Sequence, residues 1–144
     1  MASDMDLNSV GEARRVIDPC FLDTPQFEDA ALSAAIGRRT LVKLETANPV
    51  RSFKCRGVSY ALRHVPPGTT VVCASSGNFA MAVAYVGRAR GLRVRVFATH
   101  NANRCKIARV EALGAEVVRV GPDLAAARSA AEADAARRGL HLIA

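Results

Sequence analysis

The sequence predicts an α/β fold, in which a parallel sheet of about four strands lies between two layers of helices. Three observations predict it. Short apolar segments alternate with helical segments of about 10 to 15 residues from residue 70 onward. Glycine or proline follows these helical segments, where a helix is expected to stop. The chain has 144 residues, half of them hydrophobic, which is enough for one domain with its own core.

The first third of the chain precedes this regular alternation. Its N-terminal residues are polar, and we expect a flexible arm over residues 1–20. Thr24-Pro25 is typical of a helix start and Gly37 of a helix end, so a short helix is expected between them. Residues 40–45 alternate between apolar and polar side chains and predict a strand.

A second helix is expected to begin at Ser52 and to continue to about Val65, where two prolines and a glycine end it. Four strands and three helices follow it: strands at 70–74, 93–98, 116–120 and 140–143, and helices at about 78–90, from after Asn103 to Gly114, and at 123–138. Such alternation indicates right-handed βαβ units. Ligands bind at the carboxyl ends of parallel strands, so the loops after Ala74 and Ala98 are the first candidates for a site.

The net charge of +7 is the main signal in the composition, and basic domains often bind nucleic acid. Here the arginines are spread along the chain in ones and twos, with few aromatic residues between them to stack on bases. Nucleic-acid binding is therefore not expected. A positive field does favour small anionic ligands, such as carboxylates and phosphates.

The absence of long apolar segments and of a secretory signal in the sequence predicts a cytoplasmic protein with no membrane association. No apolar segment reaches the roughly 20 residues of a membrane span, and the N-terminus lacks the basic start and apolar core of a secretory signal. The four cysteines are widely separated, with no Cys/His cluster of metal-binding spacing, so no metal site is expected. Neither a zinc-protease motif, a serine-hydrolase elbow nor a nucleotide-binding glycine loop is present.

Lys54 is the first candidate for chemistry, within Ser52-Phe53-Lys54-Cys55-Arg56-Gly57. It is one of three lysines beside seventeen arginines. An ammonium group can lose its proton and attack a carbonyl, whereas a guanidinium group cannot. The helix N-terminus also disfavours the protonated form. A solvated surface lysine is the alternative that this hexapeptide alone leaves open.

The second candidate is the turn after residue 74, where Ser75, Ser76, Gly77 and Asn78 lead into a helix. Free N–H groups at the helix start and two hydroxyls are suited to an anion such as a carboxylate. An ordinary Ser/Asn cap would explain one or two of these residues but not all four. Lys106 is a third cationic candidate, which we interpret as part of a solvated helix face.

Taken in order, these motifs resemble the tryptophan-synthase-β-like superfamily of fold-type II pyridoxal-phosphate (PLP) enzymes, and within it the threonine/serine dehydratases. The resemblance covers most of the chain after about residue 20 and depends on order and spacing. It is carried by Thr24-Pro25, Leu44-Glu45, Asn48-Pro49, Ser52-Phe53-Lys54, Arg56-Gly57, Ser75-Ser76-Gly77-Asn78, Lys106, Leu113-Gly114-Ala115-Glu116 and Gly121.

The resemblance implies a PLP-dependent ammonia-lyase that deaminates L-threonine or L-serine to a 2-oxo acid and ammonia. Lys54 would bind the cofactor as a Schiff base and later move the substrate Cα proton. Phe53 and Asn78 would also contact the cofactor, and Ser75, Ser76, Gly77 and Asn78 would bind the substrate carboxylate. Ser76 is the candidate proton donor on the opposite face. A homo-oligomer is implied for the full-length protein.

The resemblance also implies a division of the chain. Residues 52–144 would form the lysine-bearing small α/β domain, and residues 21–51 would belong to the large domain of relatives. Relatives continue with a glycine-rich phosphate loop and with a Ser, Thr or Cys that faces the pyridine nitrogen. The ten glycines of this chain are dispersed, and none forms such a phosphate loop. We therefore expect weak or no catalysis by this chain alone.

Two residues depart from the family pattern. Arg51 stands where relatives commonly have glycine, and Phe79 stands where many dehydratases have histidine. These departures leave the branch of the superfamily open. A β-replacement enzyme similar to cysteine synthase or threonine synthase, and a truncated non-catalytic α/β domain, are the alternatives.

Overall fold

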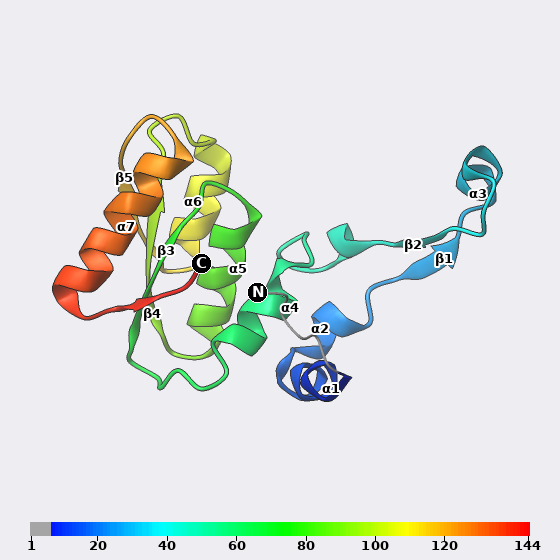
Figure 1. Ribbon diagram of the computed structural model, residues 1–144, viewed down its shortest axis with the longest axis horizontal. Helices are drawn as coiled ribbons and strands as arrows, with labels where there is room; N and C mark the ends of the chain where they lie inside the picture. The colour runs from blue at the N-terminus through cyan, green and yellow to red at the C-terminus, as the bar shows by residue number, and fades with distance from the viewer. Residues whose placement is uncertain (1–6) are drawn as a thin grey trace.

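The fold consists of a body built on a four-stranded parallel sheet and an arm that extends away from it (Figure 1). The computed structural model describes residues 7–144. The strands of the body are β3 (Thr70–Ala74), β4 (Arg93–Ala98), β5 (Glu116–Arg119) and β6 (His141–Leu142). Their order is β5-β4-β3-β6, and every neighbouring pair is parallel. The predicted α/β class with a four-stranded parallel sheet is confirmed.

Helices cover both faces of this sheet. They are α5 (Asn78–Ala89) and α6 (Arg104–Ala112) on one face and α7 (Leu124–Arg138) on the other. Alternate side chains of β3 point to opposite faces, as strand geometry requires. Val71 and Cys73 belong to the core on the α5 side, whereas Val72 packs with Ala127 and Ala131 of α7. The body therefore has the three layers that the alternation of elements predicts.

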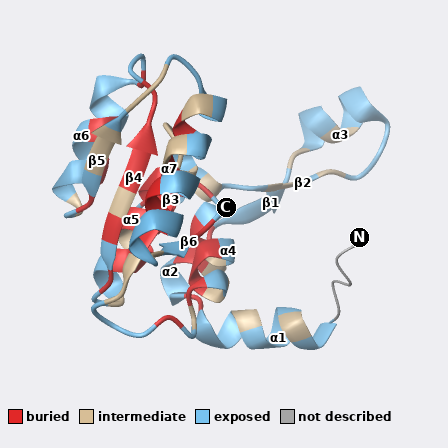
Figure 2. Ribbon diagram, turned by 60° about the vertical axis from the view of Figure 1, so that its left-hand side comes forward, coloured by how far each residue is buried: buried red, intermediate tan, exposed pale blue. Residues whose placement is uncertain are grey.

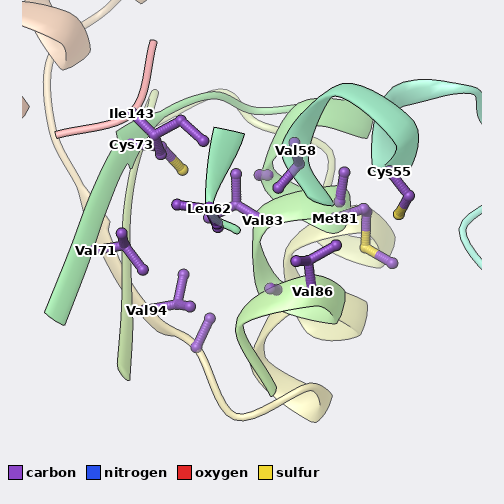
Figure 3. Close-up of a cluster of buried hydrophobic side chains, with 14 of the residues drawn as sticks. Cys55, Val58, Leu62, Val71, Cys73, Met81, Val83, Val86, Val94 and Ile143 are labelled. Carbon is purple, nitrogen blue, oxygen red and sulfur yellow. The ribbon is translucent and has the colours of Figure 1, made fainter. Parts of the chain in front are cut away.

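The core on the α5 side also anchors the helix that carries the candidate lysine. This helix is α4 (Lys54–Ala61). Its buried Cys55 and Val58, and Leu62 just after it, meet Val83 of α5 in the cluster shown in Figure 3. Leu62, Val83 and Cys55 are all fully buried. Burial of such side chains stabilises the fold by roughly 1.5–3 kcal/mol each, so α4 is fixed firmly against the body.

Several short elements come before α4; the first two pack against α4, and the others form the arm. They are α1 (Leu7–Val16), α2 (Pro19–Leu22), β1 (Gln26–Glu28), α3 (Ala30–Ile36), β2 (Leu41–Lys43) and the 3-10 turn η1 (Glu45–Ala47). The strands β1 and β2 pair antiparallel, and α3 connects them at the far tip. Figure 2 shows this tip as almost entirely exposed, and apolar Phe27, Ile36 and Leu41 are among its exposed side chains.

The N-terminal elements differ from the sequence prediction at Thr24. Residues 1–20, where a flexible arm is expected, include α1 and the start of α2, and residues 1–6 lie outside the described residues. Thr24-Pro25 does not start a helix: α3 begins at Ala30, where the Asp29 carboxylate accepts the Leu32 N–H at 2.9 Å. The predicted stop at Gly37 is confirmed, because this residue takes the left-handed conformation (φ 72°) that ends a helix.

The remaining elements follow the prediction more closely. The bounds of β3 and β4 are as predicted, and α7 starts and ends within a residue of its expected limits. The helix expected up to about Val65 is shorter, because α4 ends at Ala61 and turns connect it to β3. No helix within residues 7–144 is long and apolar enough to span a membrane.

Candidate functional site

Lys54 is the first residue of α4, and it borders a cavity of about 370 Å³. The lysine is exposed, and its backbone N–H donates to Ser52 Oγ at 3.3 Å. Its Nζ lies 5.0 Å from the centroid of the Phe53 ring. Phe79, in the first turn of α5, lines the same cavity. The structure thus brings the candidate lysine together with one aromatic side chain from each of the two sequence motifs.

The turn after β3 is ordered by its own hydroxyl groups. The Gly77 N–H donates to Ser75 Oγ at 3.2 Å. Ser76 Oγ lies 3.2 Å from Thr99 Oγ1 and also accepts the Thr99 N–H at 3.2 Å. Since β3 and β4 are neighbouring parallel strands, their carboxyl ends place these two hydroxyls side by side. No side chain caps α5, so N–H groups of its first turn are open to a ligand.

Phe79 is the residue that brings the start of α5 to the cavity beside Lys54. Lys54, Phe53 and Phe79 line the cavity, whereas Ser75 to Asn78 are not among its lining residues. Asn78 is the first residue of α5 and is exposed, and Ser75, Ser76 and Gly77 are partly buried. The cofactor and substrate contacts expected of these four residues remain predictions.

Asn48 is a buried polar residue that fixes the loop before Lys54. Its amide nitrogen donates to the Ser52 carbonyl at 3.1 Å and to Glu45 Oε2 at 3.3 Å. Its amide oxygen accepts the N–H groups of Val50 at 3.1 Å and of Ser52 at 3.3 Å. Asn48 is only 4% exposed, so water does not replace these bonds. The residues directly before Lys54 are therefore held by one side chain.

Arg56 ties the arm to α4 just after Lys54. Its Nη2 forms a 2.5 Å ion pair with Glu45 Oε1, and its Nε donates to the Phe21 carbonyl at 2.6 Å. Thr24 Oγ1 also donates to Glu45 at 3.2 Å. Thr24 and Glu45 thus have long-range partners, which explains why Thr24 does not cap a helix. Glu45 bonds to both Arg56 and Asn48, so one network holds residues on either side of Lys54 in the sequence.

Two site-building residues, Asn48 and Thr99, were not identified as functional from the sequence. In the sequence, Asn48 is distinguished only by the Asn48-Pro49 pair of the family pattern, and Thr99 only by its place in the loop after Ala98. The usable signal for Thr99 was its position: it directly follows β4, as Ser75 directly follows β3. Lys106 is exposed on α6, as its interpretation as a solvated residue requires.

The thiols near the site stay protonated. Burial raises the pKa of the Cys55 thiol, next to Lys54, to about 12, and charges at Cys20 and Asp18 add to that effect. Burial likewise raises the pKa of Cys73, in β3, to about 12. Because the thiolate is the reactive form of cysteine, neither group competes with Lys54 as a nucleophile at neutral pH.

Arg51 has a strained backbone, with φ at +57°. It is the single non-glycine residue with a positive φ among residues 7–144, and it stands where the family pattern commonly has glycine. The left-handed conformation costs an ordinary residue roughly 1–2 kcal/mol, whereas glycine adopts it freely. The Asn48 carbonyl accepts the Arg51 N–H at 2.9 Å within this loop.

Replacing Arg51 with glycine is therefore expected to stabilise the protein. We expect a gain of about 0.5–1 kcal/mol, because relief of strain exceeds the added entropy of glycine in the unfolded chain. Urea unfolding measures it. Arg51→Ala is the matched control, since it removes the same side chain but keeps the strain. A glycine variant no more stable than the alanine variant would contradict the strain argument.

The residues around the cavity fit a pyridoxal group. An amine and two aromatic rings border one space of about 370 Å³, which is within the size range of small-ligand sites. The open N-terminus of α5 begins one residue before Phe79. This arrangement has the groups that a protein of the class binding a carbonyl cofactor through a lysine requires.

Comparison with known proteins places the chain in a family. The family model described as pyridoxal-phosphate dependent enzyme matches residues 17–144. The chain belongs to this family, which implies pyridoxal 5'-phosphate as its cofactor.

Individual relatives agree with this assignment. Serine racemase of Oryza sativa subsp. indica is 32% identical over 116 residues, covering 78% of this chain and 34% of the relative. Human L-serine dehydratase/L-threonine deaminase is 33% identical over 106 residues, covering 72% of this chain and 32% of the relative. The structure of processed threonine deaminase isoform 2 from Solanum lycopersicum matches with a TM-score of 0.81 and 26% identity, covering 96% of this chain and 43% of that chain. The chain thus spans less than half the length of these relatives.

Proposed function

We propose that the protein catalyses the PLP-dependent β-elimination of L-serine or L-threonine, which releases a 2-oxo acid and ammonia. The observation that carries the proposal is the cavity shared by Lys54, Phe53 and Phe79 in the first turn of α5. A lysine amine can bond covalently to a carbonyl, and open N–H groups at a helix start can bind a carboxylate. An enzyme of this family that acts on amino acids needs both an amine for the cofactor and N–H donors for the substrate carboxylate.

Each residue has a separate task in this proposal. PLP, when bound, withdraws electrons from the substrate Cα, and the protein contributes binding, orientation and proton transfer. Lys54 Nζ holds the cofactor and takes the proton from Cα. The start of α5 and Ser75 bind the substrate carboxylate, and Asn78 orients the cofactor through its ring oxygen. Ser76 donates, on the opposite face, the proton that leaves with the β-hydroxyl. Loss of the β-hydroxyl as water leaves an unsaturated amine, whose hydrolysis gives the 2-oxo acid and ammonia.

Racemisation of serine is the second candidate, because a relative that spans 78% of this chain is named serine racemase. It requires the same removal of the Cα proton, followed by return of a proton to the opposite face. In racemisation Ser76 would return the proton to Cα, whereas in elimination it donates to the departing hydroxyl. The two reactions therefore differ in their products, not in the first step.

The products of turnover distinguish these functions. With PLP and L-serine or L-threonine, we expect the purified protein to release 2-oxo acid and ammonia in equal amounts, and slowly, because its dispersed glycines form no phosphate loop. Ser76→Ala is expected to slow this release about a hundredfold, as loss of a general acid does. Ser129→Ala, which removes an exposed serine of α7, is the matched control and should have no effect. D-serine without ammonia would overturn elimination in favour of racemisation. Absence of all three products would overturn both.

A further inference from the structure

A second cavity of about 400 Å³ lies at the opposite edge of the sheet from Lys54. The starts of β3, β4 and β5 border it, together with the segment that joins α7 to β6. Because the strands are parallel, their starts share one edge, whereas Ser75 and Thr99 follow the strand ends at the other. Figure 1 shows α7 ending at the lower left of the sheet, on the side of the strand starts. We call this space the edge cavity.

A group of charges centred on the buried Asp134 adjoins the edge cavity, and its members Arg95, Glu116 and Arg138 line it. Arg95 of β4 lies 3.0 Å from Asp134 of α7 through its Nε, and its Nη1 contacts both carboxylate oxygens of Glu116. Asp134 also pairs with Arg137 at 2.7 Å and with Arg138 at 2.9 Å. Asp134 is only 4% exposed, so this group is a fixed part of the fold.

The charges in this group do not balance. Burial alone raises the pKa of Asp134, but the hydrogen bond from Arg137 and the charges of Arg95 and Arg138 outweigh it, so the pKa lies below its usual value. Asp134 is therefore ionised at neutral pH. Arg93, also on the cavity wall, forms no ion pair with any carboxylate of residues 7–144, and its Nε donates to Thr70 Oγ1 at 3.0 Å. Over the whole group four guanidinium groups meet two carboxylates, which leaves two positive charges uncompensated; Arg93, Arg95 and Arg138 line the cavity, and Arg137 lies outside its lining.

The floor of the edge cavity is apolar. Leu92 and Val94 are buried at 8% and 6% exposure, and Leu140 is partly buried beside them. Arg138 reaches the rim with half of its side chain exposed. A guanidinium group has five N–H donors, and the Arg138 ion pair is formed through Nε. The space thus combines an apolar floor with cationic donors on its rim.

We propose that the edge cavity binds a small phosphorylated molecule. Its phosphate lies between the guanidinium groups of Arg93 and Arg138, and its apolar part covers the floor. Two uncompensated positive charges match a phosphate dianion, and the planar fork of guanidinium suits phosphate oxygens. A volume of about 400 Å³ accommodates a ligand with a ring as well as a phosphate. This site is separate from the Lys54 cavity and does not depend on the proposed function.

Phenyl phosphate tests the proposal, because it carries both a dianion and an apolar ring. The purified protein is titrated with phenyl phosphate and, separately, with inorganic phosphate, while NMR follows the backbone amides. We expect phenyl phosphate to shift the amide signals of Arg93, Gly114 and Leu140 and to bind at least tenfold more tightly than inorganic phosphate. Arg93→Gln is expected to weaken its binding about tenfold, since a charge-assisted contact is lost.

Arg119→Gln is the matched control, because it removes an exposed charge at the far end of β5 and should leave the affinity unchanged. Arg93 is exposed, so its replacement is expected to keep the thermal unfolding midpoint. Equal weakening by both substitutions would overturn the proposal, because the protein would then attract anions through its net charge alone. Amide shifts confined to the start of α5 would overturn it as well.

Discussion

Borohydride reduction of the PLP-treated protein is expected to fix the cofactor on Lys54, and Lys54→Ala is expected to lose at least nine-tenths of the label. The chain has only two other lysines. Lys43 Nζ donates to the carbonyls of Leu22 at 3.3 Å and of Thr24 at 2.9 Å, so its amine is engaged. Only Lys54 of the three borders the 370 Å³ cavity. Peptide mapping by mass spectrometry gives the position and amount of the label.

Lys106→Ala is the matched control for this experiment, because Lys106 is an exposed lysine on α6 that lines neither cavity. The control variant is expected to retain the full label on Lys54. Labelling of Lys106 in place of Lys54 would sink the Schiff-base assignment. The label reports cofactor attachment independently of turnover. It therefore tests the Schiff-base assignment without testing the reaction proposed above.

Asn48→Ala is expected to destabilise the protein by about 2–4 kcal/mol. The substitution removes four hydrogen bonds and leaves the buried N–H groups of Val50 and Ser52 without partners. Each bond contributes about 1 kcal/mol, and each unsatisfied buried group costs about 1–3 kcal/mol. Urea unfolding followed by circular dichroism measures the change. Because Asn48 fixes the loop before Lys54, the variant is also expected to take up less label at the lysine.

Asn101→Ala is the matched control for Asn48. Asn101 is exposed in the turn after β4, and its loss is expected to change the unfolding free energy by less than about 0.5 kcal/mol. If Asn48→Ala were as stable as this control, the Asn48 hydrogen bonds would contribute nothing net. A stable variant with reduced labelling would instead assign Asn48 a role in positioning alone.

The body of the fold could be predicted because its signals are local. The apolar run of β3 and the repeated caps of the later helices each report on their own segment; the Asp123 carboxylate, for example, accepts the Ala126 N–H at 2.9 Å at the start of α7. The arm could not be predicted in the same way. Thr24 has the chemistry of a helix cap, yet its hydroxyl bonds to Glu45, 21 residues further along the chain. Such a partner is visible only in three dimensions.

In the candidate site, too, some residues could be identified from local sequence and others only from the folded structure. Lys54 and the turn at Ser75 were identified because residue type and spacing carry the signal, and the family resemblance combined them. The tasks of Asn48 and Thr99 depend on which groups surround them. Thr99 is paired with Ser76, 23 residues away, through the neighbouring strand. The edge cavity was invisible for the same reason, because four arginines that are scattered along the chain gather at one sheet edge only after folding.

The strand order has a consequence for the synthesis of this protein. β3 is made early, but it lies between β4 and β6, and β6 is made only after α7. One edge of β3 therefore stays unpaired while residues 75–140 leave the ribosome, and an unpaired apolar strand edge is a template for association with other chains. Of the two inner strands, β3 is thus the first to be translated and the last to be paired on both sides.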